Sequence, residues 1–565
     1  FGSAPLTAAQ QEQLRALYRD FGQTEIDWLA STESVTRHDV KAVEYLVRDR
    51  LASLGLDAVA ELTHFACTSE DINSASYALT VRRAVENVWL PKLRAVIEAL
   101  SALAREHRDA AMLSRTHGQP ATPSTMGKEL AVFAWRLERV ATQIEGGEYL
   151  AKFSGATGTW SAHLAAAPDI DWPELSRTFI EGLGIGFNPL TTQIESHDWQ
   201  VELYDRVRHA GGILHNLATD IWTYIAMGFF AQIPVAGATG SSTMPHKINP
   251  IRFENAEANL EIAAGLFTTL ASTLVTSRMQ RDLTDSTTQR NIGVAFGHSL
   301  LALDNLQRGL KEISLNRDVL LADLDANWEV LAEAIQTVVR AEIVAGRSQI
   351  TDPYALLKDL TRGRRVGGPE LAEFVEGLDI GADAKARLVA LTPATYTGLA
   401  DALVRYPWVQ ALVFDLITPE EDEVLRRAFE SQREPLGTFT WVKDNAHVEL
   451  PSQSFTIMTK PQERQFVHDI TVIGKNATVD FVSGAAVAPE LTHATHVSVS
   501  ETYIGAGATV RSIDVDRWGA NMTVHSYDRT KIDENARVTS VSVAVSGLKQ
   551  SVNNSHTEVA AGAAI

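Results

Sequence analysis

The segment Gly240–Asn249, with the sequence GSSTMPHKIN, brings hydroxyl, ammonium and amide groups together on a stretch suited to neither a helix nor a strand. Pro245 and Pro250 lack a backbone N–H and would interrupt both kinds of hydrogen-bond ladder. A loop of this composition can surround a substrate with donors and a positive charge, and Gly237 and Gly240 suit a loop that opens and closes. The segment is therefore predicted to be a catalytic lid.

Other patches in the first 300 residues carry side chains suited to anion binding and proton transfer. They are VTRHD with Arg37, His38 and Asp39, HFACTSEDIN with His64, Thr68, Ser69 and Glu70, SRTHGQPATPST with Thr116 and His117, and SRMQRDLTDSTTQRN with Arg278, Arg281, Ser286 and Arg290. Each alone has a common structural explanation, because single histidines often lie in cores and Ser/Thr clusters often form turns and helix caps. Their combination is what indicates a site.

The elements that must position these patches are long helices. From Leu93, apolar residues recur at three- and four-residue spacing, and the same pattern recurs from Phe253 and over 201–231. Long helices joined by short polar loops are typical of a bundle. Residues 1 to about 404 are therefore predicted to be mainly α-helical.

The last 130 residues have a different pattern, with alternating polar and apolar residues rich in Val, Thr and Ser, which predicts strands. The frame Ile-x-x-x-Ala-x-Val occurs three times, in Ile473–Val479, Ile504–Val510 and Ile532–Val538. Repeats of this length in strand-rich sequence indicate stacked β-coils, so we expect an all-β, solenoid-like segment over 431–565. The acidic stretch 405–430 is expected to be a solvated connector or a short helix.

Composition excludes several function classes. The formal net charge of −20 disfavours binding to nucleic acid or to an anionic membrane surface, so an anionic substrate would need a local cluster of Lys and Arg. The single cysteine, Cys67, suits a reducing cytoplasm and is expected to be a small buried hydrophobe. The first residues show no signal peptide, and the apolar run from Ile221 contains Thr, Gln and Pro, so it is expected to be a core helix that ends before Pro234 rather than a membrane span.

Residues 1 to about 404 resemble adenylosuccinate lyase of the fumarase/aspartase superfamily. The loop 240–249 matches the superfamily's Gly-Ser-Ser-x-x-Pro-x-Lys-x-Asn signature, and HFACTSEDIN, SRTHGQPATPST and QRDLTDST resemble adenylosuccinate lyase in particular. The resemblance implies a truncated N-terminal lyase domain at 1–57, a central long-helix bundle at 58–310 and a C-terminal helical domain at 311–404. It also implies β-elimination of fumarate from adenylosuccinate and from the succinylaminoimidazole carboxamide ribotide, a purine nucleotide substrate, and a homotetramer with shared active sites. No metal or organic cofactor is implied.

The resemblance also implies roles for single residues. Ser241 matches the base that removes a proton beside a carboxylate, and Lys247 and Asn249 would stabilise the charge that develops there. His117 matches the acid that protonates the departing nitrogen, and Glu254 matches a carboxylate that can pair with it.

The resemblance implies one more catalytic residue and a set of binding residues. His64 matches a second catalytic-site histidine, which lies near the phosphate and can orient the other groups. The remaining substrate contacts of the family match Arg37, His38, Asp39, Thr68, Ser69, Thr116, Gln193, Arg281, Ser286 and Arg290. Arginines suit this task because they bind phosphate and carboxylate in a bidentate manner.

Two features depart from the family. The sequence has no match to the family's N-terminal Gly-Arg-Tyr phosphate-binding motif, and we expect that segment to lie outside this sequence. The tail instead resembles the β-helical core of the B/D subunits of the SUF iron–sulphur assembly system. Metal binding there would have to use His468, His493, His496 or His525, and a structural or partner-binding role is favoured over it.

The tail leaves a second function open. The chain could be a scaffold that binds a SUF-type protein partner through the β-solenoid, with an inactive lyase half. The residues give no physical link between the two halves, so a natural fusion and a composite chain both stay open.

Overall fold

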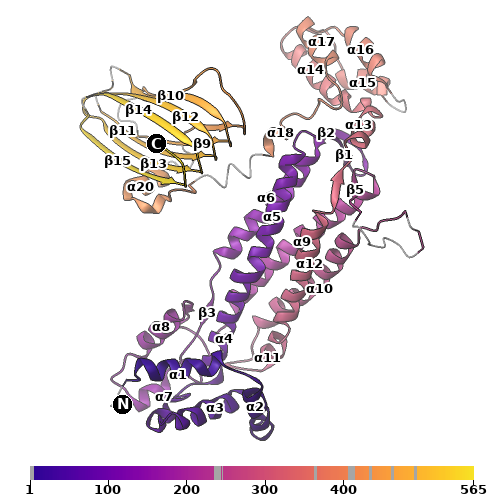
Figure 1. Cartoon of the computed structure of the whole chain (residues 1–565). Coiled ribbons are helices and arrows are strands. Elements are labelled where there is room, and N and C mark those ends of the chain that lie inside the picture. The colour runs from indigo at the N-terminus through magenta and orange to yellow at the C-terminus, as the bar shows by residue number, and fades with distance from the viewer. Residues whose placement is uncertain are drawn as a thin grey trace. The chain divides into compact units, whose positions relative to one another are not determined.

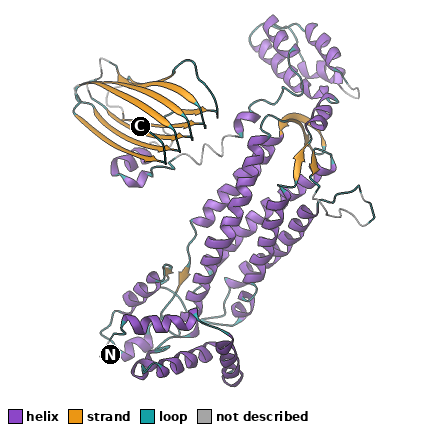
Figure 2. Ribbon diagram, in the orientation of Figure 1, coloured by secondary structure: helices purple, strands orange, loops and turns teal. Residues whose placement is uncertain are grey.

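The computed structural model describes two compact units, Phe1–Asp401 and Ala402–Ile565, which are treated separately below. The described residues are 5–234, 243–244, 246–361, 366–404, 414–431, 436–459, 464–488, 491, 493–546 and 548–565. The first unit is mainly helical and the second is mainly strand, as the two patterns in the sequence predict (Figure 2).

Five long helices pack side by side in the centre of the first unit and confirm the predicted bundle (Figure 1). They are α5 (Leu90–Glu106), α6 (Met126–Glu145), α9 (Asp198–Ala226), α10 (Ile251–Leu274) and α12 (Ile292–Gly309). Consecutive helices of this set run in opposite directions, so the connecting loops gather at the two ends of the bundle. We call these the α4 end and the hairpin end, after the elements found there.

The bundle forms because each helix buries an apolar stripe. In α5 the side chains of Leu93, Val96 and Leu100 are fully buried, at the spacing that the sequence predicts. The centre is aromatic, with the ring centroids of Phe267 and Phe296 5.1 Å apart in an edge-to-face arrangement. Burial of such rings supplies much of the hydrophobic stabilisation that holds the long helices side by side.

The hairpin end carries two short antiparallel sheets. One pairs β1 (Ala111–Thr116) with β2 (Gln119–Thr125), and the other pairs β5 (Phe230–Gln232) with β6 (Ile313–Leu315). The helix expected to reach Ala231 therefore ends earlier, at Ala226. Gly228, with φ +74°, reverses the chain there, and Phe230 is buried in the strand that follows.

The α4 end carries the start of α4 (Ser69–Ala84), which continues through a π-helical turn, Val85–Trp89, directly into α5. Shorter elements surround this end (Figure 1). They are α1 (Ala8–Arg19), α2 (Gln23–Thr36), α3 (Asp39–Ser53), the 3-10 helix Asp57–Leu62, β3 (Leu150–Ala151), α7 (Ser161–Ala166), α8 (Trp172–Gly182), β4 (Gly186–Phe187) and α11 (Thr284–Gln289).

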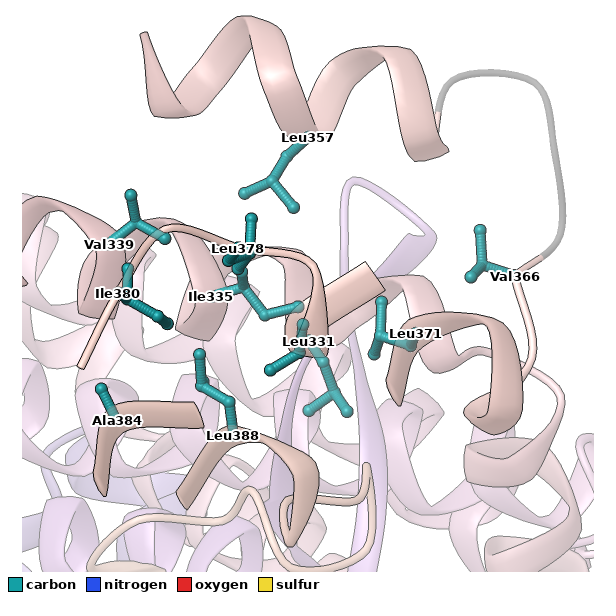
Figure 3. Packing of buried hydrophobic residues seen from close by; sticks show 11 residues of the cluster. Leu331, Ile335, Val339, Leu357, Val366, Leu371, Leu378, Ile380, Ala384 and Leu388 are labelled. Atoms are coloured by element: carbon teal, nitrogen blue, oxygen red, sulfur yellow. The ribbon is translucent and has the colours of Figure 1, made fainter. Parts of the chain in front are cut away.

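The last helices of the first unit have a small core of their own (Figure 3). The core is built by the 3-10 helix Trp328–Leu331, α14 (Ala332–Val344), α15 (Pro353–Thr361), α16 (Gly368–Glu376) and α17 (Ala382–Val389). Helix α13 (Arg317–Asp325) precedes these elements, and α18 (Ala400–Leu403) follows them and ends within the second unit. Leu331 and Ile335 lie at the centre of this core, against Leu371, Leu378 and Leu388. The predicted three-domain division of the first 404 residues is consistent with this separate core and stays a prediction.

The second unit is a parallel β-solenoid, as predicted. One sheet has the order β14-β12-β10-β8 and the other has the order β15-β13-β11-β9-β7. The strands are β7 (Phe439–Val442), β8 (Ser452–Met458), β9 (Arg464–Ile473), β10 (Thr478–Val487), β11 (Thr495–Ile504), β12 (Thr509–Trp518), β13 (Thr523–Ile532), β14 (Arg537–Ser546) and β15 (Gln550–Val559).

The repeat found in the sequence is the corner that joins the two sheets. Its Ile and Ala side chains stack in one buried ladder, Ile473, Ile504 and Ile532 with Ala477, Ala508 and Ala536. The ladder extends to Val442 and Ala446 in an earlier coil and to Ala563 in a later one. The repeat therefore has more copies than the three predicted from the sequence. The outer copies do not match the frame because they begin with Val rather than Ile.

The predicted connector is only partly a connector. Its described residues 414–431 include a 3-10 helix, Pro419–Glu421, and α20 (Glu423–Ser431), and they pack on the β-solenoid. Ile417 and Leu425 are buried against Phe466 and Val499 of the sheet. Of the two expectations for this stretch, the structure shows the short helix, whose apolar face packs on the sheet although the segment begins with acidic residues.

Candidate active site

The loop before α4 brings three predicted binding residues to the α4 end. His64 and Ala66 have left-handed backbone conformations, with φ +60° and +53°, which are uncommon outside glycine and cluster at functional sites. Thr68 precedes the helix, and its N–H donates to Asp71 Oδ2 at 2.8 Å. This bond fixes the first turn of α4 and hence the direction of the Thr68 and Ser69 side chains.

A buried ionic network joins this turn to the loop that follows α10. Arg281 donates from one terminal nitrogen to Glu70 at 3.0 Å and from the other to Asp285 at 2.6 Å. His197, at the start of α9, contacts Asp285 through Nε2 at 3.1 Å. Burial opposes ionisation of Asp285, but the bonds from His197 and Arg281 outweigh it and lower the pKa of this carboxyl.

The network defines how Arg281 can act. Each terminal nitrogen donates to one carboxylate, and the side chain is only 16% exposed. Because each of these nitrogens carries a second N–H, an anionic substrate could bind a guanidinium that Glu70 and Asp285 have already oriented. Ser286 is held alongside, since its N–H donates to Asp285 Oδ1 at 2.7 Å.

A second buried pair joins three loops at the same end. Lys152 Nζ lies 3.0 Å from Asp71 Oδ1, and both side chains are fully buried. The ammonium also donates to the carbonyl of Gln193 at 2.9 Å, which ties the predicted Gln193 loop to α4. Gln193 in turn donates from its side-chain amide to the carbonyl of Ala156 at 3.0 Å.

The Arg37–Asp39 turn and Arg290 belong to this end as well. Arg37 ends α2 in the left-handed region, and His38 caps α3 by accepting from the N–H of Lys41 at 3.3 Å. Burial raises the pKa of Tyr77 on α4, and the charges of Glu70, Asp285, Arg290 and Asp39 also act on it. The ten predicted residues at this end come from loops and helix ends at and around the start of α4. They are Arg37, His38, Asp39, His64, Thr68, Ser69, Gln193, Arg281, Ser286 and Arg290.

The hairpin end holds the other predicted residues. His117 and Gly118 form the two-residue turn between β1 and β2, with φ +52° and +74°, as a type I′ turn requires. His117 and its neighbour Thr116 are exposed at this tip. Arg115 anchors the hairpin, because it pairs with Asp323 of α13 at 2.8 Å.

The lid loop reaches α10 at the same end. Ser241, the predicted base, lies outside the described residues. The N–H of Lys247 donates to the carbonyl of Met244 at 3.0 Å, and the Gln232 side chain donates to the carbonyl of Ile248 at 2.6 Å. Asn249 follows directly and precedes α10. Glu254, in the first turn of α10, accepts from Trp222 Nε1 at 3.1 Å, and its predicted pairing with His117 stays a prediction.

The two groups of residues are far apart within one chain. Ser69 and Glu106 lie at opposite ends of the rod formed by α4, the π-helical turn and α5, which is about 55 Å long at the usual rise per residue. Even a hairpin that folded straight back along α5 would recover only about 20 Å. We call the two groups of predicted residues the half-sites, and the distance between them is too large for His64 and His117 of one chain to contact the same small substrate.

The structure also identifies site residues that sequence analysis missed. Asp71, Lys152 and Asp285 are buried and bonded to predicted residues, and His197 is buried and bonded to Asp285, but none of the four was selected. The one available signal was Lys152, a charge within the otherwise apolar run LAKF. A cation there must be paired, and its partner could not be read from the sequence.

Two of the four tail histidines considered for metal binding have side-chain partners within the protein. His468 Nε2 lies 2.6 Å from Glu501 Oε2, and His496 Nδ1 lies 3.0 Å from Gln465 Oε1. Among the described residues, no group of three or more His, Cys, Asp or Glu side chains could hold a metal ion. In the same part of the chain, no helix has the length and apolar character needed to cross a membrane.

Comparison with known proteins agrees with the fold. Residues 4–264 match the lyase family model, residues 277–397 match the adenylosuccinate lyase C-terminal model, and residues 455–564 match the core domain of the SufBD proteins of SUF iron–sulphur cluster assembly. Two solved structures share the fold, each with a TM-score of 0.55 and 21% identity. They are a fumarate lyase from Mesorhizobium sp. BNC1, covering 71% of this chain and 89% of that one, and a 3-carboxy-cis,cis-muconate lactonizing enzyme from Pseudomonas putida, covering 69% and 86%.

Curated relatives give the narrower assignment. The adenylosuccinate lyase of Vibrio cholerae serotype O1 is 50% identical over 399 residues, which are 70% of this chain and 86% of the relative. That of Escherichia coli K12 is 48% identical over 392 residues, covering 69% and 85%. The described half-sites lie within the matched region. The chain belongs to the adenylosuccinate lyase family.

Proposed function

We propose that this chain is a lyase that releases fumarate from adenylosuccinate, giving AMP, and from the succinylaminoimidazole carboxamide ribotide. The observation that carries the proposal is the 50% identity with the Vibrio cholerae enzyme over 399 residues. The two lyase family models match residues 4–264 and 277–397, and these ranges contain every predicted site residue. The reaction removes a proton from the carbon beside a succinyl carboxylate, breaks the bond between carbon and nitrogen, and delivers a proton to the nitrogen.

The residues have the chemical properties that each step needs. Ser241 is the proposed base, and its alkoxide would need the positive charge of Lys247 and nearby N–H donors in a closed site. His117 is the proposed acid for the leaving nitrogen. Lys247 and Asn249 would stabilise the charge on the carboxylate as the proton leaves, which lowers the barrier more than it strengthens substrate binding.

The active site is proposed to be shared between copies in a homotetramer. The separation of the half-sites supports this. The substrate is far shorter than the bundle, so it could not contact His64 and His117 of the same chain. The helix faces that would pack between copies are also apolar or small. Gly265 and Ile262 on α10 and Val294 and Leu301 on α12 are exposed or half-buried. Such faces on long helices are typical of interfaces between subunits.

A substrate panel tests the proposal. The purified chain is expected to release fumarate from adenylosuccinate and from the carboxamide ribotide, but not from argininosuccinate, malate or aspartate. Release from one of the latter three, with none from adenylosuccinate, would assign the chain to another activity of the same fold. The cytoplasm is the proposed location, since a reducing compartment suits the single cysteine.

A second role is proposed for the second unit, as a binding surface for a protein of the SUF type. The match of residues 455–564 to the SufBD core model supports it. The expected result is retention of a SUF-type protein on the immobilised chain, and the matched control is the same chain stopped at Val404. Equal retention on both chains would refute this role.

A further inference from the structure

We propose that the buried Asp71–Lys152 pair is a positioning device that sets the substrate-binding loops of the α4 end. The inference rests on the proposed function, since it concerns the same site. It assigns the pair no contact with substrate. Its role is to hold the loops that carry Thr68, Ser69 and Gln193 at a fixed separation.

Each proton of the Lys152 ammonium has a hydrogen-bond acceptor. Its ammonium lies within hydrogen-bond distance of Asp71 Oδ1 at 3.0 Å, the carbonyl of Gly155 at 2.8 Å and the carbonyl of Gln193 at 2.9 Å. An ammonium has three protons, so no donor is left over. Burial lowers the pKa of Lys152, and the charge of Asp71 opposes that shift.

Asp71 has a matching set of donors. Besides the ammonium, it accepts from the N–H of Thr68 at 2.8 Å, of Ser154 at 2.8 Å and of Gly155 at 3.2 Å. These bonds join the start of α4 to the loop that follows β3. Together with the bond to Gln193, the pair therefore fixes three segments that are far apart in the sequence.

Gly155 allows this close approach. Its φ is +79°, and a Cβ there would lie 3.3 Å from the carbonyl oxygen of Ala66, a tighter contact than is usual. The two loops consequently meet through backbone, next to His64. A side chain at 155 would both strain the backbone and push the loop away from Asp71.

Stability alone does not explain the pair. Burying two charges costs about as much as their attraction returns, and apolar residues of similar volume often serve as well or better. Apolar residues could not, however, bind the Gln193 carbonyl and three N–H groups. The pair differs from apolar core residues of similar volume because it forms hydrogen bonds with the loops that carry predicted substrate contacts.

The test is Lys152→Met, which removes the ammonium and leaves Asp71 with its three N–H donors. We expect KM for adenylosuccinate and the dissociation constant for AMP to rise about 10-fold, equal to 1.4 kcal/mol, with kcat within about three-fold. The matched control is Lys92→Met, which removes a lysine paired with Asp304 at 2.8 Å between α5 and α12. The control is expected to leave KM and AMP binding unchanged.

The outcomes separate the two proposals. If Lys152→Met lowers kcat or the melting temperature but leaves KM and AMP binding at wild-type values, the pair is structural only and the inference is wrong. Failure of the variant to fold would also count against it. If the unmutated chain binds AMP but releases no fumarate, the proposed function fails and AMP binding still decides the inference. If it does neither, both are overturned.

Discussion

Mixing two inactive variants should restore activity, because the two half-sites of one chain lie too far apart to act together. His64→Gln damages the α4 end and His117→Gln damages the hairpin end. Each variant alone should lose nearly all turnover if both histidines serve the proposed reaction. In a mixed oligomer, a site can draw its intact His64 from one chain and its intact His117 from another.

The magnitude of the recovery follows from this geometry. With equal amounts and random exchange, half of the chains at each position carry the intact group. About a quarter of the sites would then contain both, since the two positions are filled independently. The assay is fumarate release after the mixture has been dissociated and reassembled, with each variant treated alone as the control.

Two results would refute this reasoning. Activity that stays at the level of the single variants, although native mass spectrometry shows hybrid oligomers, would mean that each site draws both histidines from one chain. The rod of about 55 Å between Ser69 and Glu106 would then have to bend in solution. Recovery close to the full wild-type rate would also contradict it, because random exchange leaves most sites damaged.

Three further predictions follow from the structure. Ser241→Ala should reduce kcat about a thousand-fold while AMP still binds, and more than about a tenth of wild-type kcat, a loss under 1.4 kcal/mol, would rule out Ser241 as the base. Burial lowers the pKa of His496 to about 4 from 6.5, so the unfolded state binds the proton more readily and stability falls as pH drops below about 6.5. Between pH 7 and 5 the second unit should lose about 2 kcal/mol, measured by hydrogen exchange in β11, and an unchanged pH dependence in His496→Gln would refute this cause. A chain stopped at Val404 should keep its oligomeric state and fumarate release within about three-fold, whereas a tail fragment should fold only if it includes 414–431, because Ile417 and Leu425 cover its sheet.

Local patterns predicted most of the architecture. The apolar stripe from Leu93 and the Ile-x-x-x-Ala-x-Val frame each reflect burial by near neighbours, so they are visible in the sequence. The end of α9 was less visible, since a short strand pair with β6 replaced the last helical turn. The apolar face of 414–431 was hidden for a similar reason, because its partner sheet lies up to about 110 residues further along the chain.

The residues of the candidate site also fall into two groups, those that the sequence reveals and those that only the fold reveals. Residues such as His117 and Lys247 could be selected because short motifs carry them. Asp71, Lys152 and His197 could not, because their roles depend on contacts between loops that only the fold brings together. The arrangement of the two half-sites at opposite ends of the bundle was also invisible, since it depends on the direction and length of each helix.

The most direct test of the central claim is the reaction itself, followed by proton NMR on the purified chain with adenylosuccinate. The proposed function predicts that fumarate and AMP appear together in equal amounts, and that no added metal or cofactor is needed. Unchanged adenylosuccinate, at a protein concentration where the chain is oligomeric and the Escherichia coli enzyme is active, would contradict it.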